Sequence, residues 1–208
     1  NFVYNGVTYD SLADLSAAIG TTMTKDQKIS FTYDMKVDGS ILDQNGTRNT
    51  DKDKNKFKTS YKTNKDNDKT TDSWDVHVDI DAPSVSKSGT YDSTTGKVTW
   101  RITITPGVVG WDDVDFSGVT DKVTEMLGGT AFGASKDITI TKDDFTTTDN
   151  KTYVYEYTTD VSDDAKNSSS KVTAQNDVTN IQFDGHRYDT SAEAGITESK
   201  WAKKTFAS

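Results

Sequence analysis

The sequence predicts a mainly β protein built from antiparallel β-sandwich modules, with one or two short helices. Five stretches alternate apolar and polar residues with a period of two, the pattern of a strand with one buried face. Clusters of Gly, Asp, Asn and Thr separate these stretches, as they do between the strands of a sandwich. The 208 residues include 9 Tyr, 8 Phe, many Thr and only 2 Pro. This composition favours pleated sheets with one solvated face.

The alternation places the predicted strands. We expect them at residues 29–37, 76–81, 98–104, 137–141 and 153–161. The third is the strongest, because its apolar residues occupy every second position: Val98, Trp100, Ile102 and Ile104. Residues 88–96, which precede it, are interpreted as polar turn material.

Helical patterns are few. One helix is expected in SLADLSAAIG, residues 11–20. Leu12, Leu15 and Ile19 have helical spacing there, a Ser stands at the N-cap position and a Gly ends the stretch. Residues 118–129, GVTDKVTEMLGG, are expected to hold a second short helix or a turn.

Three segments are expected along the chain. Residues 1–82 form a β module that contains the helix and a long polar loop at about 43–72, in which KFKTSYK is an edge strand protected by its lysines. Residues 83–180 form a β-sandwich, and the boundary lies near Pro83 because proline restricts its neighbour and breaks strand pairing. Residues 181–208 either start a further module or complete the first.

Two stretches share the pattern N-x-x-aromatic-[ND]-G-x-x-Y-D-[ST], at residues 1–11 and 180–190. A repeated pattern favours tandem modules. The alternative is that each stretch forms a hairpin independently, because Asn-Gly and Asp-Gly are common turn dipeptides.

The composition argues against several classes of function. The net charge of −9, without a basic patch, argues against nucleic-acid binding. The absence of cysteine excludes a disulfide framework, a zinc–thiolate cluster and a thiol nucleophile, and it fits an extracellular bacterial protein. No apolar run approaches the ~20 residues of a membrane span. The start, NFVYNGVTYD, has neither Met nor the character of a signal peptide, so we expect a segment cut from a longer precursor.

Three motifs carry a resemblance to a known family. They are VSKSGTYDSTTGKVTWRITITPG at 85–107, VTEMLGG at 123–129, and YEYTTDV followed by KVTAQNDVTN within 155–180. These motifs resemble the immunoglobulin-like β-sandwich modules of Gram-positive cell-wall-anchored adhesins and pilins, of the collagen-adhesin type. In that family a Lys and an Asn join spontaneously as an intramolecular isopeptide bond, assisted by an acidic residue. The matching positions here are Lys87, Asn176 and Glu125.

The resemblance implies a non-enzymatic structural or adhesive module at the extracellular cell surface, anchored to the cell wall through parts outside this segment. The implied partners are neighbouring modules of the same chain and an extracellular host matrix protein or glycan. No cofactor, metal, nucleic acid or membrane contact is expected. The pattern departs from the family in two respects. The family's acid is typically Asp, so Asp121 is a substitute for Glu125, and Asn176 is followed by Asp177 instead of the usual small residue. Asn180 is an alternative to Asn176.

The residue types suit this chemistry for independent reasons. An amine attacks a carboxamide only when it is uncharged, and an exposed Lys near pKa ~10.4 is almost wholly protonated. Burial lowers the pKa of a Lys and raises that of a carboxylic acid. A buried acid can therefore donate a proton to the amide oxygen and carry a proton to the leaving ammonia. The alternative is that Lys87 is a solvated charge at a strand end.

Other functions have weaker support. A carbohydrate-binding sandwich appended to an extracellular enzyme would present exposed aromatic residues, of which Trp111 is the best candidate. A hydrolase is disfavoured, because no nucleophile motif is present. His77, Asp79 and Asp81 share one strand face and could ligate a metal, but solvated polar residues are the default there.

Overall fold

The computed structural model describes residues 1–24, 26–43, 46–47, 54–62, 68–73 and 76–197. The chain divides into two compact units, Asn1–Val37 and Asp38–Ser208. The fold is mainly β, with antiparallel sheets and two α-helices among the described residues, as the alternation of apolar residues predicts.

The first unit is a small three-stranded sheet with one helix. Strands β1 (Phe2–Tyr4), β2 (Val7–Tyr9) and β3 (Thr32–Tyr33) pair in the order β2-β1-β3, and α1 (Leu12–Ile19) follows β2. The predicted helix is confirmed: the Ser11 side chain accepts a hydrogen bond from the Asp14 N–H, and Gly20 ends the helix. The predicted strand at 29–37 is reduced to β3, because its partner β1 is only three residues long and stops at a turn.

The start of the second unit holds short paired strands instead of one loop. Strand β4 (Lys54–Asn55) pairs with β7 (Val76–His77), and β5 (Lys58–Lys62) pairs with β6 (Asp68–Asp72). The interpretation of residues 43–72 as one long polar loop is therefore wrong for its described part, although a strand in KFKTSYK is correct. The predicted strand at 76–81 is shorter, ending at His77.

The expected boundary at residue 82 differs from the observed division after Val37. Residues ahead of the sandwich help to close one end of its core: Leu42 is buried in it, and Ile80 and Ala82 pack against it. The Tyr188 hydroxyl also donates a hydrogen bond to the Gly46 carbonyl. These contacts join the segment from residue 38 onward to the sandwich.

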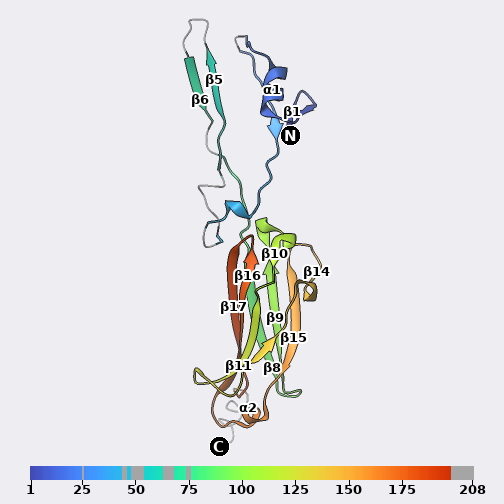
Figure 1. Cartoon of the computed structure of the whole chain (residues 1–208), viewed down its shortest axis with the longest axis vertical. Coiled ribbons are helices and arrows are strands. Elements are labelled where there is room, and N and C mark those ends of the chain that lie inside the picture. The colour runs from blue at the N-terminus through green and yellow to red at the C-terminus, as the bar shows by residue number, and fades with distance from the viewer. Residues whose placement is uncertain (25, 44–45, 48–53, 63–67, 74–75, 198–208) are drawn as a thin grey trace, which may run out of the picture. The chain divides into compact units, whose positions relative to one another are not determined.

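Two antiparallel sheets form the sandwich (Figure 1). The first sheet has the order β14 (Thr146–Thr147), β15 (Tyr153–Asp160), β9 (Lys97–Thr105), β8 (Ser84–Asp92). In the second sheet β16 (Val172–Phe183) lies between β17 (His186–Gly195) and β11 (Thr120–Leu127), with β10 (Val114–Asp115) beside the end of β16. The other edge of β11 pairs with β12 (Thr130–Ala131) and β13 (Lys136–Ile138).

Short helical elements connect these strands. They are α2 (Asp163–Asn167), at one end of the sandwich in Figure 1, and the 3₁₀ turns η2 (Gly107–Val109), η3 (Trp111–Asp113) and η4 (Lys142–Asp144). A further 3₁₀ turn, η1 (Gly39–Ile41), precedes β4. Neither α-helix of the described part of the chain has the length and apolar character that crossing a lipid bilayer requires.

The core lies between the two sheets and follows the period of two. Every second residue of β9 is buried, as predicted for residues 98–104. In β16, every second residue from Val172 to Val178 is buried, and after an irregularity the alternation resumes at Ile181 and Phe183. The core has two clusters of buried side chains, one around Ile102 and Phe183 and one around Trp100 and Val172. Tyr157 packs against both clusters, so the centre of the sandwich lies beside its ring.

Two other predictions are wrong. Residues 118–129 contain strand β11 instead of a helix or turn, because Asp121 and Val123 alternate inward and the whole stretch pairs with β16. Residues 88–92 belong to strand β8 instead of a turn. The outward residues of β8 are Ser, Thr and Asp, so its polar face resembles turn composition. The short helix α2 was not predicted.

The repeated pattern at residues 1–11 and 180–190 forms a hairpin in both places. Asn5-Gly6 and Asp184-Gly185 have positive φ angles at both turn residues, and the registers Tyr4↔Val7 and Phe183↔His186 match. The two stretches differ after the turn. After the first hairpin, Ser11 caps the start of a helix, whereas after the second, β17 continues along β16. Residues 186–195 are therefore a strand of the sandwich.

A side chain at Gly89 should destabilise the sandwich. Gly89 lies opposite Trp100, and a Cβ there would overlap the six-membered ring of the buried indole. We expect Gly89→Ala to lower the free energy of unfolding by about 1–3 kcal/mol, the usual effect of overpacking. Urea unfolding checks this, with the exposed neighbour Ser88→Ala as the control. Equal stabilities of the two variants would contradict this packing.

Candidate functional site

Lys87 lies in the middle of β8 with its side chain directed into the sandwich. It alternates with the exposed Ser86 and Ser88, and its side chain has 0% exposure. The amine nitrogen lies 5.8 Å from the centroid of the Trp100 ring and 4.9 Å from that of Tyr157. The alternative of a solvated charge at a strand end is therefore wrong.

Asp121 and Asn176 reach the same interior from the opposite sheet. They lie on the neighbouring strands β11 and β16, where Val123 pairs with Asn176 and Asp121 pairs with Val178. The Asp121 side chain has 0% exposure, and so has Asn176 as a whole residue. The register thus places an amide and a carboxyl two positions apart on one buried face.

The Tyr157 hydroxyl connects these three groups. It accepts hydrogen bonds from the Lys87 amine at 2.9 Å and from the Asn176 amide nitrogen at 2.6 Å, and it donates one to Asp121 Oδ2. The direct distance between Lys87 Nζ and Asp121 Oδ2 is 3.7 Å, which is too long for a good hydrogen bond. Since both nitrogen atoms bond the same oxygen, the amine and the amide are neighbours.

Burial shifts the ionisable groups of this cluster toward their uncharged forms. Desolvation lowers the pKa of Lys87 from 10.5 to about 8, although the nearby Asp121 carboxyl opposes the shift. Desolvation also raises the pKa of Asp121, against the hydrogen bond from Tyr157 and the charge of Lys87. The pKa of Tyr157 is raised by burial and by Asp121, so its phenol stays protonated.

Two buried oxygen atoms of the cluster have no hydrogen-bond partner within the described residues: Asp121 Oδ1 and Asn176 Oδ1. Both are acceptors, and the Asn176 side chain favours the charged form of Asp121, against the larger effect of burial on its pKa. A proton on Asp121 would give this carboxyl a donor of the kind that an amide carbonyl accepts. This protonation agrees with the raised pKa of Asp121 and would polarise the amide carbonyl.

Glu125, the predicted assisting acid, does not belong to the cluster. It faces the same side of β11 as Asp121 but pairs with Ala174, nearer the end of the strand. Its carboxylate accepts hydrogen bonds from the backbone N–H and hydroxyl of Ser162, the N-cap residue of α2. The structure therefore corrects this assignment, and Asp121 is the acid beside Asn176.

Asn180 is not an alternative to Asn176. It lies at an irregularity in the pairing of β16 with β17 and has a positive φ of 67°. Its amide donates a hydrogen bond to the Gly118 carbonyl, away from the Lys87 cluster.

The sequence reasoning missed Tyr157. It lies on the same face of β15 as Tyr153 and Tyr155, because the three residues occupy every second position of the strand, so this face carries three tyrosines. A buried Tyr hydroxyl needs a hydrogen-bond partner, and that requirement was the available indication of a polar group opposite the strand.

The other candidate sites are not supported by the geometry. The Trp111 ring is half-buried, stacks on Tyr153 with 3.9 Å between centroids, and lies 5.4 Å from the Lys142 amine. Trp100 is fully buried, whereas Trp74 and Trp201 lie outside the described residues. No group of three His, Cys, Asp or Glu residues suited to a metal ion is found in the part of the chain that the structure describes, which includes residues 76–81.

Comparison with known proteins adds no homologue. No protein-family model matches the chain, and no curated protein or solved structure matches it significantly. The cluster of Lys87, Asp121, Tyr157 and Asn176 is therefore the feature of this chain that bears on its function.

The buried amine should make stability depend on pH in a chain that cannot react. In Asn176→Ala we expect the free energy of unfolding to rise between about pH 8 and pH 10.5. The pKa of Lys87 is about 8 when folded and 10.5 ordinarily, so in this window the unfolded chain binds the extra proton and rising pH favours folding. The full rise is on the order of 3 kcal/mol. Urea titrations at several pH values measure it.

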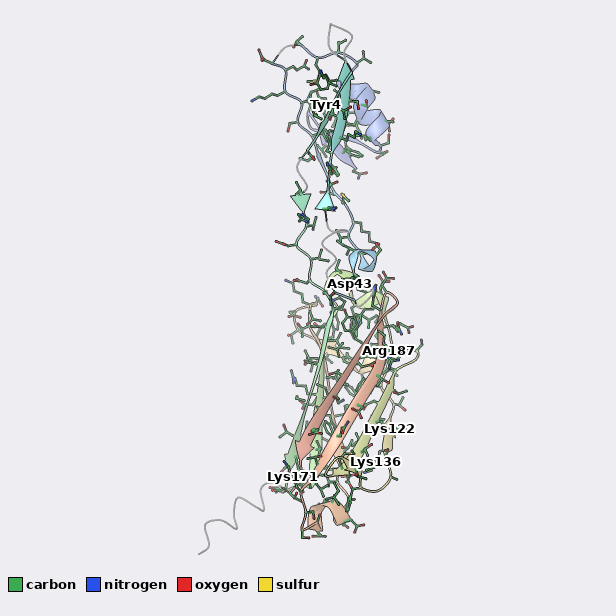
Figure 2. All side chains as sticks on the ribbon, turned by 90° about the vertical axis from the view of Figure 1, so that its left-hand side faces the viewer. Tyr4, Asp43, Lys122, Lys136, Lys171 and Arg187 are labelled. Carbon is green, nitrogen blue, oxygen red and sulfur yellow. The ribbon has the colours of Figure 1, made fainter. Side chains whose placement is uncertain are left out.

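The control for this experiment removes the amine. Lys87→Met in the Asn176→Ala background should lose most of the rise. Lys122→Met in the same background should keep it, because Lys122 lies on the outer face of β11, as Figure 2 shows, with 53% side-chain exposure. If the free energy of unfolding still rises with pH in the variant without Lys87, the rise does not come from the Lys87 amine.

Proposed function

We propose that this chain is a structural or adhesive module of a bacterial cell-surface protein, stabilised by a self-formed isopeptide bond between Lys87 and Asn176. The observation that carries this proposal is the burial of an amine, an amide and a carboxyl around one hydroxyl, inside a β-sandwich. Such a cluster is unfavourable as a purely structural feature, because buried polar groups and charges lose their hydration.

The proposed reaction is a condensation within the chain. The uncharged Lys87 Nζ attacks the side-chain carbonyl carbon of Asn176 and forms a C–N bond. The bond from that carbon to Nδ2 breaks, and Nδ2 leaves as ammonia. Asp121, protonated, donates a hydrogen bond to the amide oxygen and stabilises the negative charge that develops there. The sandwich holds the amine and the amide close together, and proximity alone can lower the activation free energy by several kcal/mol.

The bond would clamp the two sheets together. Lys87 belongs to β8 in the first sheet and Asn176 to β16 in the second, so the closed loop contains most of the sandwich. By analogy with disulfides, closing a loop of this size contributes about 4–5 kcal/mol through the entropy of the unfolded chain. The chain has no cysteine, so a disulfide cannot serve this purpose.

This role agrees with a non-enzymatic module. The reaction consumes the chain's own side chains once, and its only released product is ammonia. We propose that the module is displayed outside the cell on a cell-wall-anchored protein, next to further modules of the same chain. An extracellular matrix protein or glycan of a host is the proposed partner, in keeping with the adhesin-like motifs.

Intact mass spectrometry tests the bond. We expect the purified chain to be lighter than its sequence mass by one ammonia molecule, because the condensation releases Nδ2. Lys87→Ala and Asn176→Ala should each have the full mass of their sequences, and the exposed-lysine control Lys122→Ala should keep the deficit. A wild-type mass equal to the sequence mass would remove the cross-link from the proposal.

A second pair of variants tests the acid. Asp121→Asn keeps the shape but has no carboxyl proton to donate, and we expect it to slow bond formation by about 10²–10⁴-fold, the usual contribution of a general acid. Glu125→Gln should form the bond at the wild-type rate, because Glu125 contacts Ser162. The fraction of cross-linked chain against time after synthesis gives both rates. The opposite pattern would return the role to Glu125.

A further inference from the structure

We infer that Tyr157 is a catalytic residue of the cross-linking reaction, whose hydroxyl transfers a proton from the attacking nitrogen of Lys87 to the leaving nitrogen of Asn176. The inference rests on the proposed function and extends it to a residue that the sequence motifs do not indicate. It starts from the position of one oxygen atom, which contacts both nitrogen atoms that exchange places in the reaction.

The hydrogen-bonding capacity of the phenol determines which atoms face it. A tyrosine hydroxyl donates one hydrogen bond and accepts two. Its proton is directed to Asp121 Oδ2, so both remaining neighbours must be donors. The Asn176 atom at 2.6 Å is therefore the amide nitrogen, which leaves, and not the carbonyl oxygen. The remaining bond comes from the attacking amine at 2.9 Å.

The condensation needs one net proton transfer between these same nitrogen atoms. Starting as a neutral amine, Lys87 Nζ gives up one hydrogen when it becomes an amide nitrogen. Asn176 Nδ2 gains one hydrogen when it leaves as ammonia. In the reactants the Tyr157 proton is directed to Asp121, so the hydroxyl first turns to Nδ2, whose lone pair becomes free once Nζ has attacked the carbonyl carbon. Tyr157 then gives this proton to Nδ2 and takes one from Nζ, which leaves the phenol unchanged. This proton transfer needs no water molecule and no external base.

The surroundings favour Tyr157 over other groups for this transfer. The Lys87 amine lies 3.7 Å from Asp121 Oδ2, beyond good hydrogen-bond range, whereas Tyr157 bridges the gap. The hydroxyl of Thr159, on the same strand, is already engaged elsewhere, because it accepts a hydrogen bond from the indole N–H of Trp100 at 2.9 Å. Burial raises the pKa of Tyr157, so the phenol exchanges one proton for another without forming a phenolate.

The decisive comparison is Tyr157→Phe with Tyr155→Phe. Both changes remove one hydroxyl from the same face of β15, and the two rings stack with 5.0 Å between centroids. In a cell-free synthesis quenched with acid and followed by intact mass, we expect Tyr157→Phe to lose ammonia about 10²-fold more slowly than wild type. Tyr155→Phe should react at the wild-type rate. Equal rates for wild type and Tyr157→Phe would overturn the inference.

A second measurement separates proton transfer from positioning. A 2,3-difluorotyrosine at position 157 keeps the hydroxyl in place but makes the phenol more acidic. If the phenol protonates the leaving nitrogen, the bond should form several-fold faster, whereas an unchanged or lower rate would assign Tyr157 a structural role only. Near-ultraviolet circular dichroism confirms that each variant is folded. A wild-type chain that keeps its ammonia would instead refute the cross-link itself.

Discussion

The Tyr157 hydroxyl is the interaction on which the interior of the sandwich depends. It is the shared partner of an amine, a carboxyl and an amide that have no access to water. Burying such groups without hydrogen bonds would cost several kcal/mol. The phenol contacts all three groups with one donor and two acceptor positions. Within the described residues, Asp121 Oδ1 and Asn176 Oδ1 are left without a hydrogen-bond partner.

The apolar framework determines where this cluster forms. Trp100 occupies the space that the missing side chain of Gly89 leaves on β8, and its ring lies beside the amine of Lys87. Across the core, Asn176 interrupts a row of buried apolar residues on β16. The polar groups therefore meet where the two apolar clusters join, and this position keeps them away from water.

Local pattern was sufficient for part of this structure. The alternation at 98–104 predicted a strand, and β9 is paired on both edges. The motifs also indicated Lys87 and Asn176, and both side chains lie in the buried cluster. For the acid, the motifs favoured Glu125 and left Asp121 as a substitute. Asp121 and Glu125 have the same parity on β11, so both face inward, and only the register with β16 shows which of them lies near Asn176. Tyr157 was missed for a similar reason, since its partners come from three other strands.

The energetics of the cluster provide a direction for the proposed reaction. Before condensation, folding has to desolvate an amine whose pKa falls to about 8 and a carboxyl whose pKa rises, so the unreacted sandwich is less stable than its packing alone would make it. In the proposed reaction, conversion of the Lys87 amine into an amide would remove the charge of the amine permanently, and a protonated Asp121 would remain as a neutral donor to the new carbonyl. The desolvation penalty of burying the Lys87 amine and the Asp121 carboxyl is therefore a property of the folded chain before the proposed reaction. In the proposed reaction the fold would assemble the reactants first, and the bond would then remove the electrostatic penalty of burying them.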